Sequence, residues 1–371
     1  MTSRTISVDV IRVPTKGPGD VSGLTALIEA GAIDPATILA VLGKTEGNGG
    51  VNDFTREYAL AALCEALAPY LKLPARAVED RIAFVMSGGT EGVLSPHVTV
   101  FTRSVNDAAA SGSPAGGKRL SLGIAHTRNF LPEELGRQAQ IEETMKAVHL
   151  AMRDAGIDDP RDVHFVQIKC PLLTSERIEA ALHRGQKTVT TGAYASMGYS
   201  RGASALGVAM ALGELKGAVR EDQVLKDWDL YSSVASSSAG IELMHNVVIV
   251  LGNAAASRSP FVIGHAVMRD SIDLAAVMAA LGSVGLGDET ARQNGRLVNI
   301  FAKAEASPDG CVRGFRHTML DDSDVGSTRH ARAAVGGLVA GLSGTGAVYV
   351  SGGAEHQGPP GGGPVAVIAR V

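Results

Sequence analysis

The chain has 371 residues, of which 45% are hydrophobic and 19% are charged. Such a chain can bury a core, is not intrinsically disordered, and has room for two or three domains. Its net charge of −4 and its aromatic content of 4% argue against nucleic-acid binding, which uses basic patches and stacking rings.

The first residues contain no apolar signal core, and the longest apolar stretch, residues 246–256, is too short to span a bilayer. The three cysteines, Cys64, Cys170 and Cys311, lie far apart and form no disulfide or zinc pattern. We therefore expect a cytoplasmic protein that contacts neither membranes nor nucleic acids.

In chain order, a pattern begins near residue 30 that recurs twice. A helix ending at Gly31, an Asp-Pro turn and an apolar strand ending at Lys44 come first. Thr55-Arg56 then opens an alanine-rich helix, with the hydroxyl as a candidate N-cap. A second apolar strand ends in Ser87-Gly88-Gly89.

The second copy keeps the spacing without a gap. The lysine lies 13 positions after the glycine in Gly31–Lys44 and in Gly156–Lys169 (44 − 31 and 169 − 156). Ser200-Arg201 precedes its alanine-rich helix. Its second strand contains residues 236–238, all serines, and the glutamate four residues further on selects Ser238, as a glutamate does in the first copy.

The third copy is looser. Gly285 precedes an apolar strand ending at Lys303, Thr328-Arg329 opens a helix, and a strand ends in Ser351-Gly352-Gly353. The lysines of the three copies lie 125 and 134 residues apart (169 − 44 and 303 − 169), which is domain-sized and longer than a solenoid repeat. The sequence therefore predicts an α/β fold of three structurally similar α/β domains around a pseudo-threefold axis.

The predicted domains are residues 1–104, 112–250 and 256–371. Their boundaries are placed at two stretches rich in turn-forming residues, 110–117 and 252–260.

Matching lysines, arginines and serines in three domains would converge on the axis. A single Lys or Arg at a strand end is usually a solvated charge, and one Ser-Gly-Gly is usually a turn, but recurrence in three copies favours a shared site. Guanidinium groups match planar, oxygen-rich ligands. Serine with a neutral lysine is typical of nucleophilic catalysis, and glycine after serine lets backbone N–H groups approach an oxyanion.

The three lysines are not equivalent in sequence. Lys44 and Lys303 are followed two residues later by Glu46 and Glu305, which can hold them charged. Lys169 has a proline at that position. We therefore expect Lys169 to have no anionic neighbour and the lowest pKa, which would make it the best base.

Residues 43–54, 85–92 and 350–353 resemble the cyanuric acid hydrolase and barbiturase family, and the likeness covers nearly the whole chain. The resemblance implies that Lys169 and Ser238 are the catalytic pair, with Ser238 as nucleophile, although the three consecutive serines leave that register open. It implies a substrate site that comprises Arg56, Arg201, Arg329, Ser87, Gly88, Ser238, Ala239, Ser351 and Gly352, with Lys44 and Lys303 beside them.

The same resemblance implies a homotetramer and a structural divalent cation, Mg²⁺ or Ca²⁺, near the last loop. The matching residues are Glu305, Ala354, Gln357, Gly358, Pro359 and Gly362. A carboxylate, a side-chain amide and backbone carbonyls are ligands that such a cation takes. The alternative is a Gly/Pro-rich loop closed by hydrogen bonds alone. No organic cofactor is expected.

The implied activity is hydrolysis of cyanuric acid, a planar ring with three carbonyl groups, to carboxybiuret, which then loses carbon dioxide to give biuret. Barbiturase activity, which gives ureidomalonate from barbituric acid, is the alternative within the same reaction class. A non-catalytic binder of anionic ring compounds is the alternative outside it.

Overall fold

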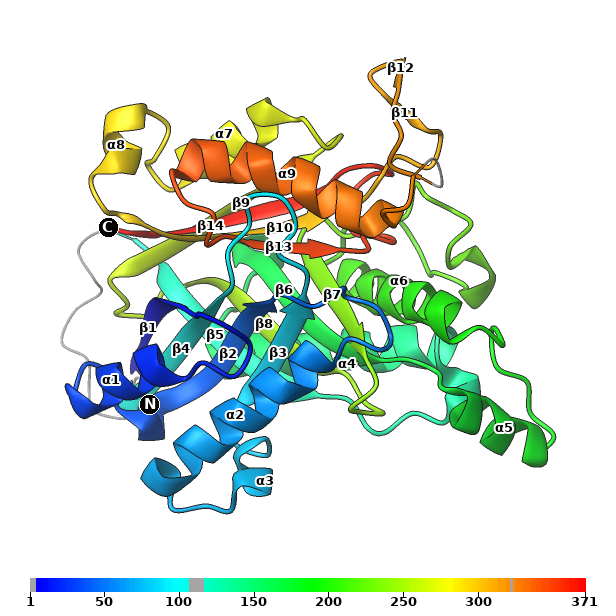
Figure 1. The fold of residues 1–371 in the computed structure, drawn as a ribbon, viewed down its shortest axis with the longest axis horizontal. Coiled ribbons are helices and arrows are strands. Elements are labelled where there is room, and N and C mark those ends of the chain that lie inside the picture. Colours follow the sequence, from blue (N-terminus) through cyan, green and yellow to red (C-terminus); the bar gives the residue numbers. More distant parts are fainter. Residues whose placement is uncertain (1–4, 107–116, 321–322) are drawn as a thin grey trace.

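The computed structural model describes residues 5–106, 117–320 and 323–371. These residues form three four-stranded sheets, with helices on their outer sides (Figure 1). A separate hairpin is made of β11 (Cys311–Val312) and β12 (Phe315–Arg316). Most of the first predicted boundary, residues 110–116, lies outside the described residues.

The three sheets share one topology, in which the strand order is first, last, second and third of each unit. The first sheet contains β1 (Thr5–Pro14), β4 (His97–Asn106), β2 (Ile38–Thr45) and β3 (Ala83–Gly88). The second contains β5 (Arg119–His126), β8 (Val247–Ala254), β6 (Val163–Pro171) and β7 (Ala235–Gly240). The third contains β9 (Phe261–Met268), β14 (Gly363–Arg370), β10 (Leu297–Ala304) and β13 (Tyr349–Gly352). This repetition confirms the predicted triplicated α/β architecture.

Each unit also contributes its own helices. They are α1 (Ser22–Glu29), α2 (Phe54–Leu71) and α3 (Ala75–Val78), then α4 (Gln138–Ala155), α5 (Ser175–His183) and α6 (Ala193–Ala211), then α7 (Leu274–Ser283), α8 (Glu289–Gln293) and α9 (Ser327–Ser343). Short 3-10 turns are η1 (Pro35–Thr37), η2 (Pro132–Glu134), η3 (Pro160–Asp162) and η4 (Glu221–Gln223). Within the described ranges, no helix combines the length and the hydropathy needed to cross a membrane.

Two strands run past the predicted domain limits. β4 ends at Asn106 and β8 at Ala254, two and four residues beyond the expected ends (106 − 104 and 254 − 250). Both strands pair along their whole length with the first strand of their unit, so backbone hydrogen bonding carries the sheet further than the turn-forming residues suggested.

The repeated turn takes the same form in the first two units. The Asp34 carboxylate accepts a hydrogen bond from the N–H of Ala36, and the Asp159 carboxylate accepts one from the N–H of Arg161. The glycine that closes the preceding helix has a positive φ in all three units, at Gly31, Gly156 and Gly285. Glycine adopts this left-handed conformation without a Cβ clash, and this is why it marks each helix end.

The predicted N-caps are wrong. Asp53, Gly192 and Gly326 stand at the N-cap positions of α2, α6 and α9. Thr55 and Thr328 therefore lie at the second helical position, and Ser200 is the eighth residue of α6. In α2, the Asp53 carboxylate accepts hydrogen bonds from the backbone N–H and the hydroxyl of Thr55, so the acidic residue outcompetes the hydroxyl as the cap.

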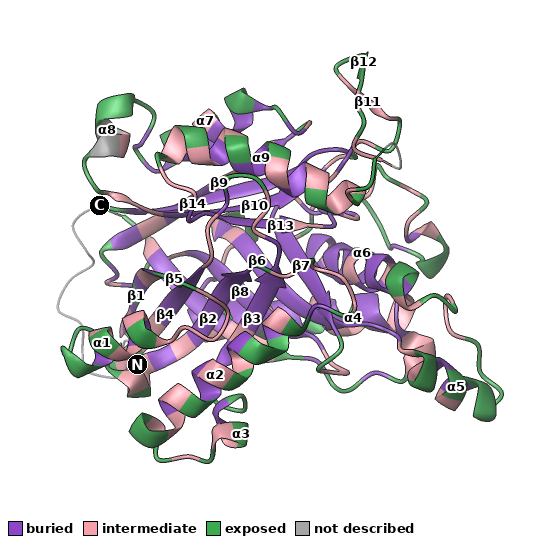
Figure 2. Cartoon of the chain, in the orientation of Figure 1, coloured by how far each residue is buried: buried purple, intermediate pink, exposed green. Residues whose placement is uncertain are grey.

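The strands place one side-chain row inward and the other toward the helices. In β8, Ile249 and Leu251 belong to a central cluster shared by all three sheets, whereas Val248 and Val250 pack with α4 and α6. The strands are accordingly buried and the outer helix faces exposed (Figure 2). At the centre, the Phe301 ring lies 6.3 Å from that of Phe101, 5.3 Å from Phe165 and 5.6 Å from Tyr349.

Phe301→Ala is expected to destabilise the whole molecule, because this ring joins the cores of three units. Removing a buried Phe costs about 3–5 kcal/mol. Thermal and urea unfolding of this variant should show a large loss, whereas Phe315→Ala, at a side chain that is 78% exposed, should change little. Equal small losses for the two variants would contradict a shared central core.

Candidate active site

Strand pairing brings each predicted lysine beside its serine. The lysine lies one or two residues before the end of the second strand of the unit, and the serine is its register partner on the third strand, which runs parallel to it. The paired residues are Lys44 with Ser87, Lys169 with Ser238, and Lys303 with Ser351. The sequence left open which of the three consecutive serines matches Lys169, and the strand register pairs Lys169 with Ser238.

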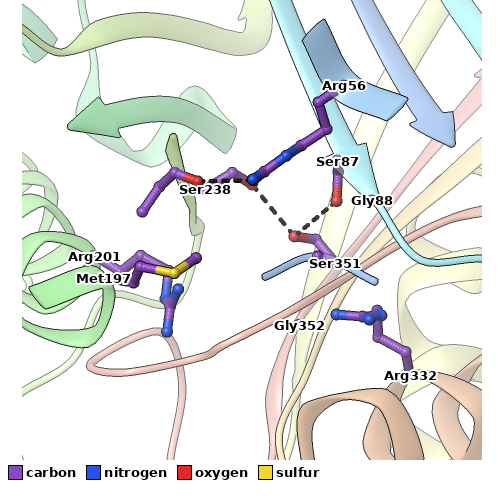
Figure 3. A pocket seen from close by; sticks show the side chains of 11 residues that line it. Arg56, Ser87, Gly88, Met197, Arg201, Ser238, Arg332, Ser351 and Gly352 are labelled. Carbon is purple, nitrogen blue, oxygen red and sulfur yellow. Dashed lines mark hydrogen bonds between the residues drawn. The ribbon is translucent and has the colours of Figure 1, made fainter. Parts of the chain in front are cut away.

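The three serines meet in the wall of one cavity, where Figure 3 shows them facing one another. The Ser351 Oγ lies 3.3 Å from the Ser238 Oγ and 3.4 Å from the Ser87 Oγ. By contrast, Ser236 donates to the Gln167 side chain, and the buried Ser237 hydroxyl has no hydrogen-bond partner. Only the third serine of that run therefore reaches the shared centre.

These serines line a small cavity of about 30 Å³. Its walls are Gly49, Arg56, Ser87, Gly88, Met197, Arg201, Ser238, Ala239, Arg332, Ser351 and Gly352. It adjoins a wider cavity of about 300 Å³ that shares Gly49, Met197, Arg201, Arg332 and Gly352 and also includes Arg329. The outer cavity is large enough for a small ring compound.

All three lysines are buried beneath the serines. The Lys44 Nζ donates to the Ser87 Oγ at 3.2 Å and to a backbone carbonyl at the same distance. The Lys303 Nζ donates to the Ser351 Oγ at 3.2 Å and to two backbone carbonyls. The Lys169 Nζ instead lies 2.7 Å from a carboxylate oxygen of Glu242 and donates to the carbonyl of the residue before Ser87.

Burial lowers the pKa of every one of these lysines. It lowers the pKa of Lys44 well below its usual range. Burial and the charge of Arg201 lower the pKa of Lys303 to about 7. The pKa of Lys169 is also lowered by burial, and the negative charge of Glu242 opposes that shift.

The expectation that Lys169 has no anionic neighbour and the lowest pKa of the three lysines is therefore wrong: burial lowers the pKa of Lys44 well below its usual range, whereas Glu242 opposes the lowering at Lys169. Its carboxylate comes from Glu242, 73 residues further along the chain (242 − 169), in the segment after β7. Neither Lys44 nor Lys303 has an ion pair with a carboxylate in the described part of the chain, although each precedes a glutamate by two residues. Glu46 and Glu305 lie at or beyond the strand end, where the backbone direction changes, so their carboxylates need not reach the lysine two residues earlier. Tertiary packing can instead bring a carboxylate from a distant part of the chain to a lysine.

Two of the predicted arginines line the inner cavity and the third does not. Arg56 from α2 and Arg201 from α6 are in its wall. The third position is taken by Arg332, which is 3% exposed, whereas the Arg329 side chain is 47% exposed and reaches only the outer cavity. The prediction took the arginine after a Ser or Thr at the start of each helix. The cavity arginines Arg56, Arg201 and Arg332 instead lie at different positions along α2, α6 and α9, which begin at residues 54, 193 and 327.

Two arginines are fixed by glutamates from a neighbouring unit. Arg332 pairs with Glu91, with nitrogen–oxygen distances of 2.7 and 2.8 Å, and Arg201 pairs with Glu355, with an Nε–Oε2 distance of 2.7 Å. Both glutamates lie four residues after a cavity serine. The repeated spacing of four residues between serine and glutamate is the sequence feature that points to these glutamates as partners of the cavity arginines.

The glycines after the serines leave room for these arginines. Gly89 and Gly353 have φ of +104° and +75°, and a Cβ on either would lie within 2.6 Å of the guanidinium of Arg332 or Arg201. A side chain at these positions would displace a cavity arginine. The repeated Gly-Gly is thus a requirement of the arginine position as well as of the backbone.

The predicted cation ligands lie after β10 and between β13 and β14. The Glu305 carboxylate accepts backbone N–H groups of Ala306 and Ala354, at 3.0 and 3.1 Å. The Gln357 Oε1 accepts the N–H of Ser237 at 2.6 Å, which ties the loop to β7. A cavity of about 240 Å³ is lined by Glu305, Ala354 and Gly358, and the Pro359 carbonyl accepts the N–H of Gly362.

A buried centre of three serines and three lysines, lined by arginines, is suited to an oxygen-rich ligand and is typical of enzymes that act through a serine. Comparison with known proteins identifies the family within this class. The family of amidohydrolase ring-opening proteins matches residues 9–370, and this chain belongs to it.

Similar proteins match along the whole chain. A cyanuric acid amidohydrolase from Bradyrhizobium diazoefficiens is 73% identical over 99% of both chains. One from Pseudomonas sp. strain ADP is 61% identical over 98% of this chain and 99% of its own. A solved cyanuric acid hydrolase, described as an evolutionary innovation by structural concatenation, superposes with a TM-score of 0.94 at 59% identity, covering 99% of this chain and 100% of that one.

Arg332→Ala is expected to lower kcat/KM for a cyclic-amide substrate by roughly 100-fold or more, because it leaves a buried ligand oxygen without its partner and removes the two shortest contacts of Glu91. Arg329→Ala is the matched variant, since Arg329 also contacts Glu91 but from the outer cavity. Its kcat/KM should fall less than tenfold. Steady-state kinetics would contradict the assignment if Arg329→Ala were the more damaging of the two.

Proposed function

We propose that this protein opens the ring of cyanuric acid by hydrolysis, with Ser238 as nucleophile and Lys169 as base. The observation that carries the proposal is the threefold arrangement of serine, lysine and arginine around one cavity. Cyanuric acid is a planar ring with three equivalent carbonyl groups, so each unit faces one edge of the ring. The names of the relatives at 73% and 61% identity support the same substrate.

In the first half-reaction, the Ser238 Oγ attacks a ring carbonyl carbon while neutral Lys169 takes its proton. The ring C–N bond then breaks, and the Lys169 ammonium gives that proton to the departing nitrogen. The opened ring stays attached to Ser238 as an acyl-enzyme. Water next attacks the acyl carbon, its proton passes through Lys169 to the Ser238 Oγ, and carboxybiuret is released.

Two features of the site support this assignment. Ser238 is the most exposed of the three serines at 8%, and its hydroxyl lies 3.3 Å from the Ser351 Oγ. Ser87 and Ser351 are each engaged by their own lysine as well. Residues Gly88, Ala239 and Gly352 follow the serines in the cavity wall, where backbone N–H groups can stabilise an oxyanion.

Ser238→Ala and Lys169→Ala are expected to reduce turnover by roughly 1,000-fold or more while the variants still bind the ring. Ser87→Ala, Ser351→Ala, Lys44→Ala and Lys303→Ala should act mainly on KM. Product analysis should detect biuret from cyanuric acid. An active Ser238→Ala beside an inactive, ligand-binding Ser87→Ala or Ser351→Ala would reassign the nucleophile. Ureidomalonate from barbituric acid, with no biuret, would reassign the substrate.

We also propose that the loop between β13 and β14 holds a structural divalent cation. Glu305 supports this, because burial and the neighbouring charge of Glu355 raise its pKa, so a bound cation would offset a costly carboxylate. Among the described residues, no group of three or more His, Cys, Asp or Glu side chains is placed to bind a metal. The ligands would therefore be Glu305, the Gln357 side chain and backbone carbonyls of the loop.

The response to added cation and chelator distinguishes the two accounts of this loop. If a cation is bound, the parent should be stabilised by added Mg²⁺ or Ca²⁺, by about 2.7 kcal/mol at 100 times Kd, and Glu305→Gln should lose that stabilisation. If hydrogen bonds alone close the loop, neither cation nor chelator should change the melting temperature of either protein. Thermal scans with and without chelator measure both.

Homotetrameric assembly and a cytoplasmic location stay predictions that rest on the family resemblance and on the sequence. Sedimentation equilibrium tests the first.

A further inference from the structure

The threefold pattern of charge is broken at one of its three positions. A glutamate lies four residues after each cavity serine, and two of them, Glu91 and Glu355, pair with arginines. The third, Glu242, has Arg56 nearby but contacts the Lys169 Nζ instead, at 2.7 Å. Arg56 donates to backbone carbonyls, including that of Ala239 at 3.0 Å. The middle unit alone therefore connects its lysine to a carboxylate.

The turn that carries Glu242 is held in place by contacts of its own. The Arg177 guanidinium donates to the carbonyl of Ile241 at 2.7 Å and to that of Leu172 at 2.6 Å. Gly240 has no Cβ, and one placed there would lie 2.1 Å from a carboxylate oxygen of Glu242. The carboxylate thus folds back over this glycine toward the lysine.

Glu242 also faces a second cavity of about 280 Å³, which shares no wall residue with the cavity of the serines. Its wall includes Glu79, Asp80, His126 and His245. The first three of these are exposed, so the cavity opens to solvent, and the Glu242 side chain is 30% exposed. Lys169 itself is 1% exposed.

We propose that Glu242 is a positioning and proton-exchange residue that connects Lys169 to water in this second cavity. This inference rests on the proposed function, in which Lys169 is the base for Ser238. A bound ring fills the cavity of the serines and blocks that route to solvent. Glu242 gives the buried lysine another route, so its neutral form can be restored while substrate or product is still bound.

The ionisation of the product supplies a proton for such an exchange. Water and the acyl-enzyme give a carbamic acid, and its ionisation within the site protonates the Lys169 amine that the preceding steps left neutral. That proton passes from the Nζ to the Glu242 carboxylate and then to water in the second cavity. The carboxylate and the neutral amine are regenerated, and no other bond changes.

Within residues 5–106, 117–320 and 323–371, neither of the other two lysines is in contact with a carboxylate. Lys44 and Lys303 contact serine hydroxyls and backbone carbonyls, none of which takes up a proton near neutral pH. The cavity next to Glu242 is instead lined with groups that exchange protons. His126 and His245 stack at 5.4 Å, and burial lowers the pKa of both, so they are neutral near pH 7.

Several charges act on this pair. Arg56 lies near both Lys169 and Glu242, Arg177 lies near Glu242 from α5, and burial and Glu242 raise the pKa of Glu79. The direct contact decides the sign, because a carboxylate at 2.7 Å favours the protonated form of the lysine. Removing the charge of Glu242 therefore lowers the pKa of Lys169. Activity needs the neutral lysine, so it extends to lower pH.

The test is Glu242→Gln, measured as kcat and kcat/KM against pH with cyanuric acid. The acid limb of kcat/KM should move to lower pH, and kcat at neutral pH should fall roughly 10- to 100-fold. Formate added to Glu242→Ala should restore part of kcat, since a small carboxylate can enter the second cavity. Glu91→Gln is the matched control, and it should raise KM without moving the acid limb.

Ser238→Ala, assayed in parallel, separates the two levels of the argument. If Ser238→Ala is inactive while Glu242→Gln, shown by its melting curve to be folded, keeps the parent pH profile and kcat, the inference fails and the proposed function stands. If Ser238→Ala is active, the proposed function itself fails. A lower kcat with no shift of the acid limb and no rescue by formate would reduce Glu242 to a structural residue.

Discussion

The burial of three lysines at one point is the constraint on which the rest of the site depends. Three ammonium groups cannot remain charged together in a place from which water is excluded, because desolvation and mutual repulsion both disfavour it. The fold surrounds Lys44 and Lys303 with serine hydroxyls and backbone carbonyls, pairs Lys169 with Glu242, and keeps two of the nearby arginines neutralised by glutamates from neighbouring units. Burial thus favours the neutral form of each lysine, and at Lys169 the Glu242 carboxylate opposes that shift.

In the proposed function, the symmetry of the site serves binding, and the departure from symmetry in the middle unit serves chemistry. Three equivalent units offer a planar ring three similar edges, but a reaction at one carbonyl needs one base and one nucleophile. The middle unit differs in that Glu242 has left the arginine position for Lys169. A triplicated fold can thus keep two units for binding and change a single ion pair to define where bond breaking occurs. The central aromatic cluster around Phe301 holds the units in register for both tasks.

Sequence predicted the parts of this site that local spacing controls. Equal spacing between glycine and lysine reflects a shared turn and strand, and so Lys44 and Lys169 were placed correctly at strand ends beside serines. Arg332 was missed because the start of a helix does not tell which of its later residues faces the cavity. In α9 the cavity arginine lies three residues beyond the predicted Arg329. Glu242 was missed as a partner because its contact with Lys169 forms only when separate segments pack together.

The most direct measurement is the identification of the acylated serine. Ring opening leaves every substrate atom attached to the nucleophile, so rapid quenching should yield a protein heavier by the full mass of one cyanuric acid molecule. Peptide mapping is predicted to place that mass on the peptide containing Ser238, with the peptides of Ser87 and Ser351 unchanged. The added mass on either of those two peptides would contradict the claim that the middle unit performs the chemistry.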